Sequence, residues 1–580
     1  MLTRSSSFSD ADSLVGHFGD RVTRRLPLSR QMNPQQTVSW LSCCMFGLVI
    51  FGGSFSARAA ESAQTSDFNR VYNALKEARR EAVERYAVEL LQVAEDAANA
   101  GFDDVCRRAL RQVRTLLRRP EDRRRNSGVD APRLRRSADE STFAKRIHRR
   151  LRRLKRQLGR TPIEKGATRD ERYGATQPFV DKLERARRRF VKSLSSLANR
   201  CVRHGFPAHG YEVVLWTLRF DPENSRLRKT MRQQEFVDPK SGEVRWYGPF
   251  DFSRASRGMV DHPRYGWVTA DQQQQLEKGL SWHNGAWHPS AEVDAKRRQW
   301  KHRWTHETEH FIVHTNAPIE DAVSFGREVE QLYSFVFRVW VEFFAFDDAQ
   351  AAKDLILRGG KELGARKLFL NYFRSRESYV DAIENDAALR SQDGATLLKD
   401  SAGFYSSATG RAYFFRGLDG PQLRTIYHEV THQIFGETFA RGHAPTWLAE
   451  GIAVFMEDPI IRGQRGAQRL LAGAQAPRGL REHPIDVNVF LRTRNDPSVF
   501  HAAERRENYS TAGAVVHFFL LHKGGVYRRG FIRYAREAYR NTRQESPTPV
   551  AKLYEYLGTS AEMLQEAWSD FNRTPDLFDF

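Results

Sequence analysis

The chain has 580 residues, enough for several domains of roughly 100–200 residues each. It carries 92 Lys and Arg against 71 Asp and Glu, a formal net charge of +21, and its 38 Phe, 18 Tyr and 11 Trp can build sizeable cores. This composition excludes collagen-like and wholly disordered proteins, and four Cys are too few for a disulfide scaffold. A polytopic membrane protein is excluded because a single stretch is long and apolar enough to cross a bilayer.

That stretch lies near the N-terminus, where no charged side chain occurs from Met32 to Ala57. Arginines before it and Ala57-Arg58-Ala59 after it are typical of a secretory signal peptide. We therefore predict that residues 1–59 are a signal peptide and that the rest is exported to the periplasm, the cell surface or the medium. An uncleaved membrane anchor is the alternative, and translation could start at Met1 or Met32.

Residues 66–236 are predicted to be mostly α-helical, because apolar side chains recur at helical spacing over 66–120 and 178–235. Two stretches in this region resemble each other, since in each a helix meets Gly-Phe, at 101–102 and 205–206, before a second helix. They are similar to the helix-turn-helix units of tetratricopeptide repeats, and an ordinary bundle of helical hairpins is the alternative. Cys106 and Cys201, in the same region, could pair in an oxidising compartment or stay buried as free thiols.

A basic stretch with few apolar residues runs between the two copies, over residues 118–176, and is densest at 145–156. Such a stretch can contact an anionic polymer through counterion release. The alternative is a solvated helix or a disordered arm, which is the usual behaviour of blocks of like charge. We expect no nucleic-acid partner, because an exported chain does not meet a genome.

Residues 237–302 form a Trp- and Gly-rich connecting segment, for which short strands and turns are predicted. From 303 onward the pattern mixes strands and helices, which defines a last domain over 303–580. Strands are predicted at 310–315, 354–357 and 367–370, a long amphipathic helix at 318–345 and a hairpin over 403–415.

The decisive motif is HEVTH at residues 428–432, on a predicted helix that ends near residue 436. His428 and His432 lie one turn apart on a shared face, so both can reach one Zn²⁺, and Glu429 is placed to act on a water there. Glu450, on a second predicted helix, is the candidate third ligand, and His443 is its rival. Two His and one Glu with an open fourth position are typical of a catalytic zinc site.

The stretches HEVTHQIFG and PTWLAEGIAVFME resemble the gluzincin metallopeptidases, whose second helix carries a W-L-x-E-G-x-A signature. The Gly-x-Met-Glu-Asn stretch of the related aminopeptidases is absent from the sequence, which favours an endopeptidase. The chain is most similar to the peptidase-MA-like group of bacterial secreted proteins, in which a tEHFiVhT strand, a saGfY hairpin and these two helices occur in this order. The resemblance covers residues 303–525.

The resemblance implies an α+β fold in which a small mixed sheet accompanies the zinc-binding helices. It assigns one Zn²⁺ to His428, His432 and Glu450, and it makes Glu429 the general base and proton shuttle. A gluzincin usually also supplies a Tyr or His to hold the tetrahedral oxyanion, and Tyr509 is the candidate here. The alternative for Tyr509 is an aromatic side chain packed at the start of a helix, and His517 on the same helix is expected to be a core residue.

Thermolysin-like enzymes place a carboxylate that orients the first His at the position that is Val454 in this chain. Glu457, on the same predicted helix, is the candidate replacement, and a carboxylate on the helix surface is the alternative. The hairpin over 403–415 would provide the edge strand along which an extended peptide lies.

The sequence therefore predicts a secreted zinc-dependent peptidase that cleaves peptide bonds in a peptide or protein substrate by Glu-assisted attack of a zinc-bound water. The alternative is a non-catalytic cell-surface interaction protein, in which helical repeats bind a partner and the zinc-peptidase fold is a relic. The intact Glu429 favours the enzyme, since a relic has no physical need of that carboxylate beside the two His.

Overall fold

The computed structural model describes residues 52–117, 138–158, 169–344, 367–390, 399, 401–417, 422–439, 444–457, 485–501, 505–541 and 549–573. The chain divides into two compact units, Met1–Phe55 and Ser56–Phe580. The apolar stretch of the predicted signal peptide or anchor lies almost wholly outside the described residues. None of the described helices combines the length and the apolar character that a bilayer span requires.

The N-terminal region is helical where the periodicity predicts helices, although the first helix begins earlier than expected. Its apolar faces share one core, which includes Leu90, Leu110, Leu154 and Leu194. The helices are α1 (Gly52–Asn99), α2 (Asp103–Leu117), α3 (Ala138–Gln157), α4 (Arg169–Arg203), α5 (Pro207–Thr217) and α6 (Ser225–Thr230).

The two Gly-Phe turns have the same backbone geometry. Gly101 and Gly205 adopt left-handed φ values of 81° and 83°. The following N–H groups, of Phe102 and Phe206, donate back to carbonyls five residues earlier, each at 2.8 Å. This pattern is a Schellman C-cap, in which glycine adopts the left-handed conformation at no steric cost. One turn type is thus used twice, and the likeness to tetratricopeptide repeats stays a prediction.

Cys106 and Cys201 are buried in the helical core as free thiols. Of the two alternatives, a disulfide or two free thiols, the structure has the free thiols. Burial raises the pKa of Cys106 to about 11 and that of Cys201 to about 12. Both side chains therefore behave as small apolar groups at neutral pH.

The densest part of the basic stretch lies in α3, which has one side buried in the helical core and is not solvated all round. Phe143, Ile147, Leu151 and Leu154 are buried in the helical core at helical spacing, while most of the basic side chains between them are exposed. Residues 118–137 and 159–168 of the stretch lie outside the described residues. The expectation of a solvated helix is therefore corrected for 143–154: one side of this segment is core.

The connecting segment contains three consecutive units, each an antiparallel hairpin followed by a short helix. Trp246, Trp267 and Trp287 take the same place in the three units, two residues before the helix N-cap, and lie 21 and 20 residues apart. The units are β1 (Gln234–Val237), β2 (Val244–Tyr247) and α7 (Pro249–Ala255); β3 (Val260–His262), β4 (Gly266–Val268) and α8 (Ala270–Glu277); and β5 (Leu280–His283), β6 (Ala286–Pro289) and α9 (Ser290–Arg297).

A mixed five-stranded sheet lies at the centre of the last domain, in the order β10-β11-β9-β8-β7. Strands β8, β9 and β11 run parallel to one another, and β7 and β10 pair antiparallel at the two ends. The strand predicted at 354–357 lies outside the described residues. The strands are β7 (Trp304–Glu307), β8 (Phe311–Thr315), β9 (Leu368–Phe373), β10 (Gly403–Ser406) and β11 (Arg411–Phe415).

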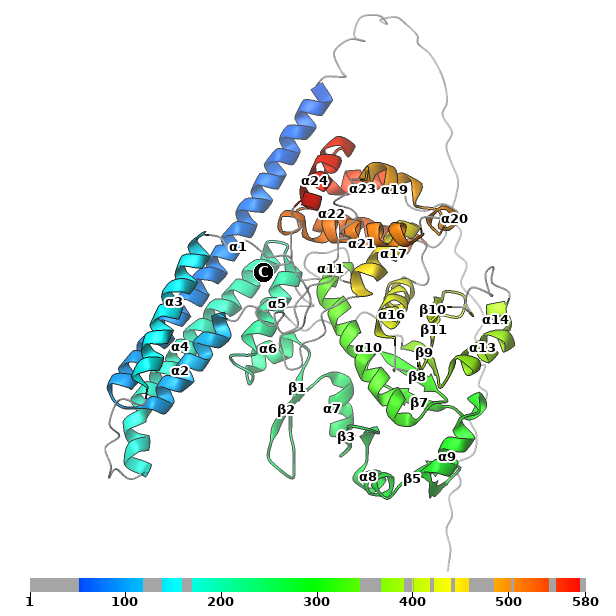
Figure 1. Cartoon of the computed structure of the whole chain (residues 1–580), viewed down its shortest axis with the longest axis horizontal. Helices are drawn as coiled ribbons and strands as arrows, with labels where there is room; N and C mark the ends of the chain where they lie inside the picture. The colour runs from blue at the N-terminus through cyan, green and yellow to red at the C-terminus, as the bar shows by residue number, and fades with distance from the viewer. Residues whose placement is uncertain are drawn as a thin grey trace, which may run out of the picture. The chain divides into compact units, whose positions relative to one another are not determined.

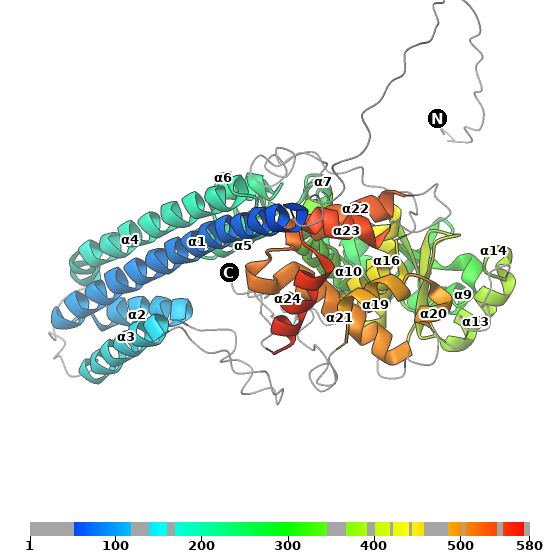
Figure 2. The same ribbon diagram turned by 90° about the horizontal axis from the view of Figure 1, so that it is seen from above.

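Helices cover both faces of this sheet, which explains why its central strands are largely apolar. Phe311, Leu370 and Phe414 face α10 (Ile319–Val339) and α16 (Leu423–Thr438), and a smaller core that includes Phe404 and Tyr413 faces α13 (Arg376–Asn385). Figure 1 shows α10 and α16 beside the sheet, and Figure 2 shows α16 and α13 on opposite sides of it. The helix predicted over 318–345 breaks at Trp340 and continues as α11 (Val341–Phe344).

The remaining helices pack beyond α16, and two glycines set the closest approach among them. A Cβ at Gly451 would lie 2.6 Å from the Ala512 carbonyl oxygen, and one at Gly513 would lie 2.5 Å from Val454 Cγ1. Helices α17 and α21 therefore contact each other almost backbone to backbone. The described helices here are α17 (Thr446–Glu457), α19 (Val487–Thr493), α20 (Pro497–Phe500), α21 (Arg505–Leu521), α22 (Arg528–Arg540), α23 (Val550–Leu557) and α24 (Ala561–Arg573).

Candidate metal centre

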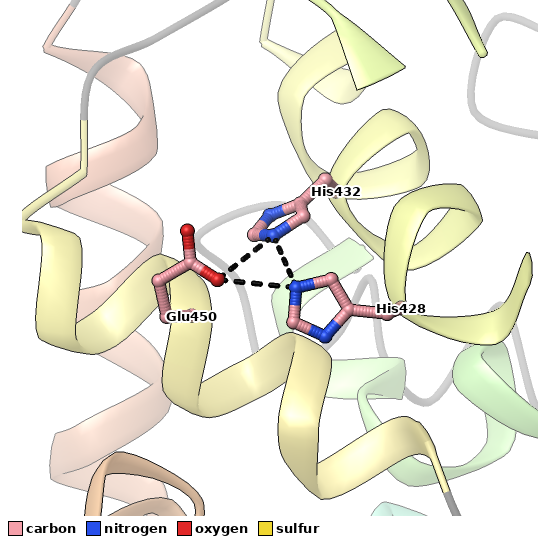
Figure 3. Close-up of side chains that lie close together, drawn as sticks. All are labelled: His428, His432 and Glu450. Atoms are coloured by element: carbon pink, nitrogen blue, oxygen red, sulfur yellow. Dashed lines mark hydrogen bonds and ion pairs between the residues drawn. The ribbon is translucent and has the colours of Figure 1, made fainter. Parts of the chain in front are cut away.

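Three side chains from two helices converge on one point (Figure 3). His428 and His432 project from α16, and Glu450 projects from α17, which packs against it. The Nε2 atoms of the two His are 3.1 Å apart, and Glu450 Oε2 lies 3.1 Å from His428 Nε2 and 3.3 Å from His432 Nε2. The sequence-predicted trio is thus brought together, whereas His443 lies outside the described residues.

The triangle of donor atoms has the size that one metal ion requires. For tetrahedral coordination with bonds of about 2.0–2.1 Å, neighbouring ligand atoms lie about 3.3 Å apart. The three measured separations of 3.1–3.3 Å match this value. His428, His432 and Glu450 can therefore hold a metal ion without rearrangement.

The charges around the trio favour a cation. Burial lowers the pKa of His428, but its hydrogen bonds to Glu450 and Glu457 outweigh burial and raise the pKa to about 10. Burial raises the pKa of Glu450, but the two imidazoles outweigh it and hold that pKa well below the usual range. Without a metal ion, His428 is therefore protonated at neutral pH beside ionised carboxylates, so metal binding at this centre has to release that proton.

Glu457 orients the first His from its second ring nitrogen. Its Oε1 lies 2.8 Å from His428 Nδ1, and its other oxygen accepts a hydrogen bond from Arg424. Val454, one turn earlier on α17, instead contacts Gly513 of α21. A carboxylate one helical turn after Val454 thus orients His428, and the alternative of a surface carboxylate is wrong.

Replacing Glu457 with Gln should weaken metal binding by about 10–100-fold, because the neutral amide oxygen is a weaker acceptor for His428 Nδ1 and no longer raises the basicity of the ring. Competition with a chromophoric chelator measures this change. Glu566→Gln, an exposed carboxylate on α24, is the matched control and should bind metal like the wild type. Equal affinities for both variants would contradict the assigned role of Glu457.

Glu429 lies next to the metal ligand His428 on α16 and also contacts the end strand of the sheet. Its Oε2 accepts a hydrogen bond of 2.9 Å from the backbone N–H of Tyr405 in β10. Burial raises the pKa of Glu429. The Tyr405 hydroxyl donates to Glu437 at 2.8 Å, so this side chain lies along α16. One oxygen of Glu429 is thus fixed by a hydrogen bond. Burial shifts the pKa of its carboxyl group toward the range of a general base.

Tyr509, from α21, completes the surroundings of the trio. Its ring centroid lies 6.0 Å from that of His428, and its hydroxyl lies 3.4 Å from His501 Nδ1. The Tyr509 ring also packs against Phe500. Tyr509 is therefore both a packed aromatic residue near the start of α21 and a neighbour of the candidate metal centre. His517, on the same helix, contacts Phe455 and Phe571 and is a core residue as expected. His501 was not predicted to lie near Tyr509, because its local sequence contains no motif that indicates a role in the site.

Comparisons of the chain with protein-family models, with curated proteins and with solved structures found no match. The geometry alone defines the chemistry that the centre can perform. Three donors can hold one metal ion, the partly buried carboxylate of Glu429 is adjacent to His428 on the same helix, and the phenol ring of Tyr509 has its centroid 6.0 Å from that of His428. Such a set can activate water next to a polarised carbonyl group.

Proposed function

We propose that this protein is a zinc-dependent peptidase of the gluzincin type, within the peptidase-MA-like group. The observation that carries the proposal is the convergence of His428, His432 and Glu450 to 3.1–3.3 Å beside the carboxylate of Glu429. Two imidazoles and one carboxylate are the protein ligands of catalytic zinc in thermolysin-type sites. Among the described residues the group offers three donors, so a fourth position is left for water or substrate.

The bound cation would supply a Lewis acid that polarises a carbonyl and makes water more acidic. Glu429 takes a proton from the attacking water and returns it to the leaving amine. The Tyr405 N–H holds one oxygen of Glu429 in place while the other remains for proton transfer. The Tyr509 hydroxyl donates to the oxyanion that develops on the attacked carbonyl.

The proposed substrate is an extended peptide, because β10 ends the sheet among the described strands. In an antiparallel strand, the N–H and C=O of one residue point to the same side, and successive residues alternate. The Tyr405 N–H donates to Glu429 and not to β11, so Tyr405 and Gly403 direct their backbone groups away from β11. A peptide added along this edge would pass Glu429 in an extended conformation, as in other strand-addition complexes.

Digestion of a broad peptide library by the zinc-loaded full chain tests the proposal. We expect cleavage within peptides, its loss on chelation and its return when zinc is restored. No cleavage by a zinc-loaded chain would favour the alternative, a non-catalytic interaction protein with a relic zinc fold. Cleavage that resists chelation would exclude the metal-dependent mechanism.

A further inference from the structure

Helix α3 presents a continuous basic face on the side opposite its buried stripe. The exposed side chains from 145 to 156 are His148 and seven Lys and Arg, and one row of these Lys and Arg follows the spacing of four, three and four residues along the helix. The basic face is Lys145, Arg146, Arg149, Arg152, Arg153, Lys155 and Arg156. Because Ile147, Leu151 and Leu154 are fixed in the core, this face is held toward solvent.

The segment that contains α2 and α3 holds most of the net charge of the protein. Residues 103–157 include 20 Lys and Arg against 7 Asp and Glu, which is +13 of the total of +21. The self-repulsion of such a segment destabilises the folded chain unless counterions or a partner offset it. Solubility alone therefore does not explain why the positive charge is concentrated in residues 103–157.

Few of the charges of α3 are neutralised by ion pairs with other described residues. Glu95 of α1 pairs with Arg150 at 2.7 Å and with Arg153 at 3.1 Å. No described residue forms an ion pair with Lys145, Arg149, Arg152, Lys155 or Arg156. These five cations remain available to an external anion.

We propose that the basic face of α3 binds a linear polysaccharide that carries one carboxylate per sugar. The row Lys145, Arg149, Arg152 and Arg156 extends over about 17 Å, with one cation per turn of about 5 Å. A pyranose ring is of similar length, so a polymer with one carboxylate per sugar has about the same linear charge spacing as this row of cations. Arginine forks suit this partner because they bind carboxylates through two parallel hydrogen bonds.

The face lacks the groups that would recognise the other common polyanions. Its exposed positions from 145 to 156 hold no Asn or Gln to read base edges and no Phe, Tyr or Trp on which bases could stack. The charge of a DNA duplex, one per about 1.7 Å, is far denser than this row. A membrane surface is disfavoured because the apolar side of α3 is used by the protein core.

The test measures binding of the full chain to fluorescently labelled oligogalacturonate of about twelve sugars, by anisotropy over a range of salt. The variant replaces Lys145, Arg149, Arg152 and Arg156 with Gln, which keeps helix propensity. We expect wild-type binding that weakens with salt, at least about a tenfold loss of affinity in the variant and a shallower salt dependence. Circular dichroism establishes that both proteins are folded.

The matched control removes four exposed charges outside the helical region, through Gln at Lys278, Lys296, Arg298 and Lys301. It should bind like the wild type. An equal loss in the control would mean that net charge alone, and not α3, governs binding, and would overturn the proposal. So would absence of binding, or tighter binding to a DNA duplex or to anionic vesicles than to the polysaccharide. The inference is independent of peptidase activity.

Discussion

Replacing Glu429 with Gln should lower peptide hydrolysis by at least about 10²-fold while metal content and the unfolding temperature stay at wild-type values. Glu429 accepts the Tyr405 N–H but is not one of the three donors. Gln keeps the size and one acceptor oxygen, so the contact with β10 survives while the basicity is lost. Hydrolysis of a library-derived peptide, metal analysis and thermal unfolding of the same samples measure the three quantities.

The control for this experiment is Glu437→Gln, because Glu437 lies on the same helix and contacts Tyr405 through the hydroxyl. It should retain most of the activity. If Glu429→Gln cleaved as fast as the wild type, Glu429 would not be the base. If the variant lost its metal as well, the loss of activity would have a structural cause.

Glu450→Gln should weaken metal binding by more than about 100-fold, beyond the loss expected for a residue that only orients a ligand. The variant removes the anionic donor of the trio while leaving both imidazoles in place. Excess metal at about 100 times its Kd should stabilise the wild type by about 2.7 kcal/mol and the variant far less. Thermal unfolding with and without zinc measures this difference.

The Glu450 experiment is paired with a variant of His443, the other candidate for the third ligand. If Glu450→Gln kept wild-type affinity and His443→Ala lost it, His443 would be the third ligand. If neither changed, the centre would not bind zinc through α17. Glu566→Gln again serves as the carboxylate control, since its exposed position on α24 is outside the trio.

Local patterns made much of the site predictable. His428 and His432 share one helix, and a spacing of four residues fixes their relation whatever the rest of the chain does. Glu450 was harder to predict, because its approach depends on how α17 packs against α16. The W-L-x-E-G pattern at residues 447–451 supplied that information through resemblance and not through geometry.

Tertiary packing decided what the sequence left open. Glu457 reaches His428 because Gly513 and Val454 fix how α17 packs against α21, a contact between residues far apart in the chain. Short strands and turns are predicted for the connecting segment, but its division into three similar units is not, because the units share one Trp position and little other sequence. His501 meets Tyr509 only through the placement of α20 beside α21.

The position of β10 at the end of the described sheet has a consequence for solubility. An end strand can act as a template for any other extended chain, including another copy of the same protein. Many proteins blunt such edges with proline or inward charges, but an edge that receives substrate has to stay open. Here the strand is four residues long, and Glu429 already occupies one outward N–H. The short length of β10 and the Glu429 carboxylate would thus limit aggregation and still leave part of the strand edge for a peptide.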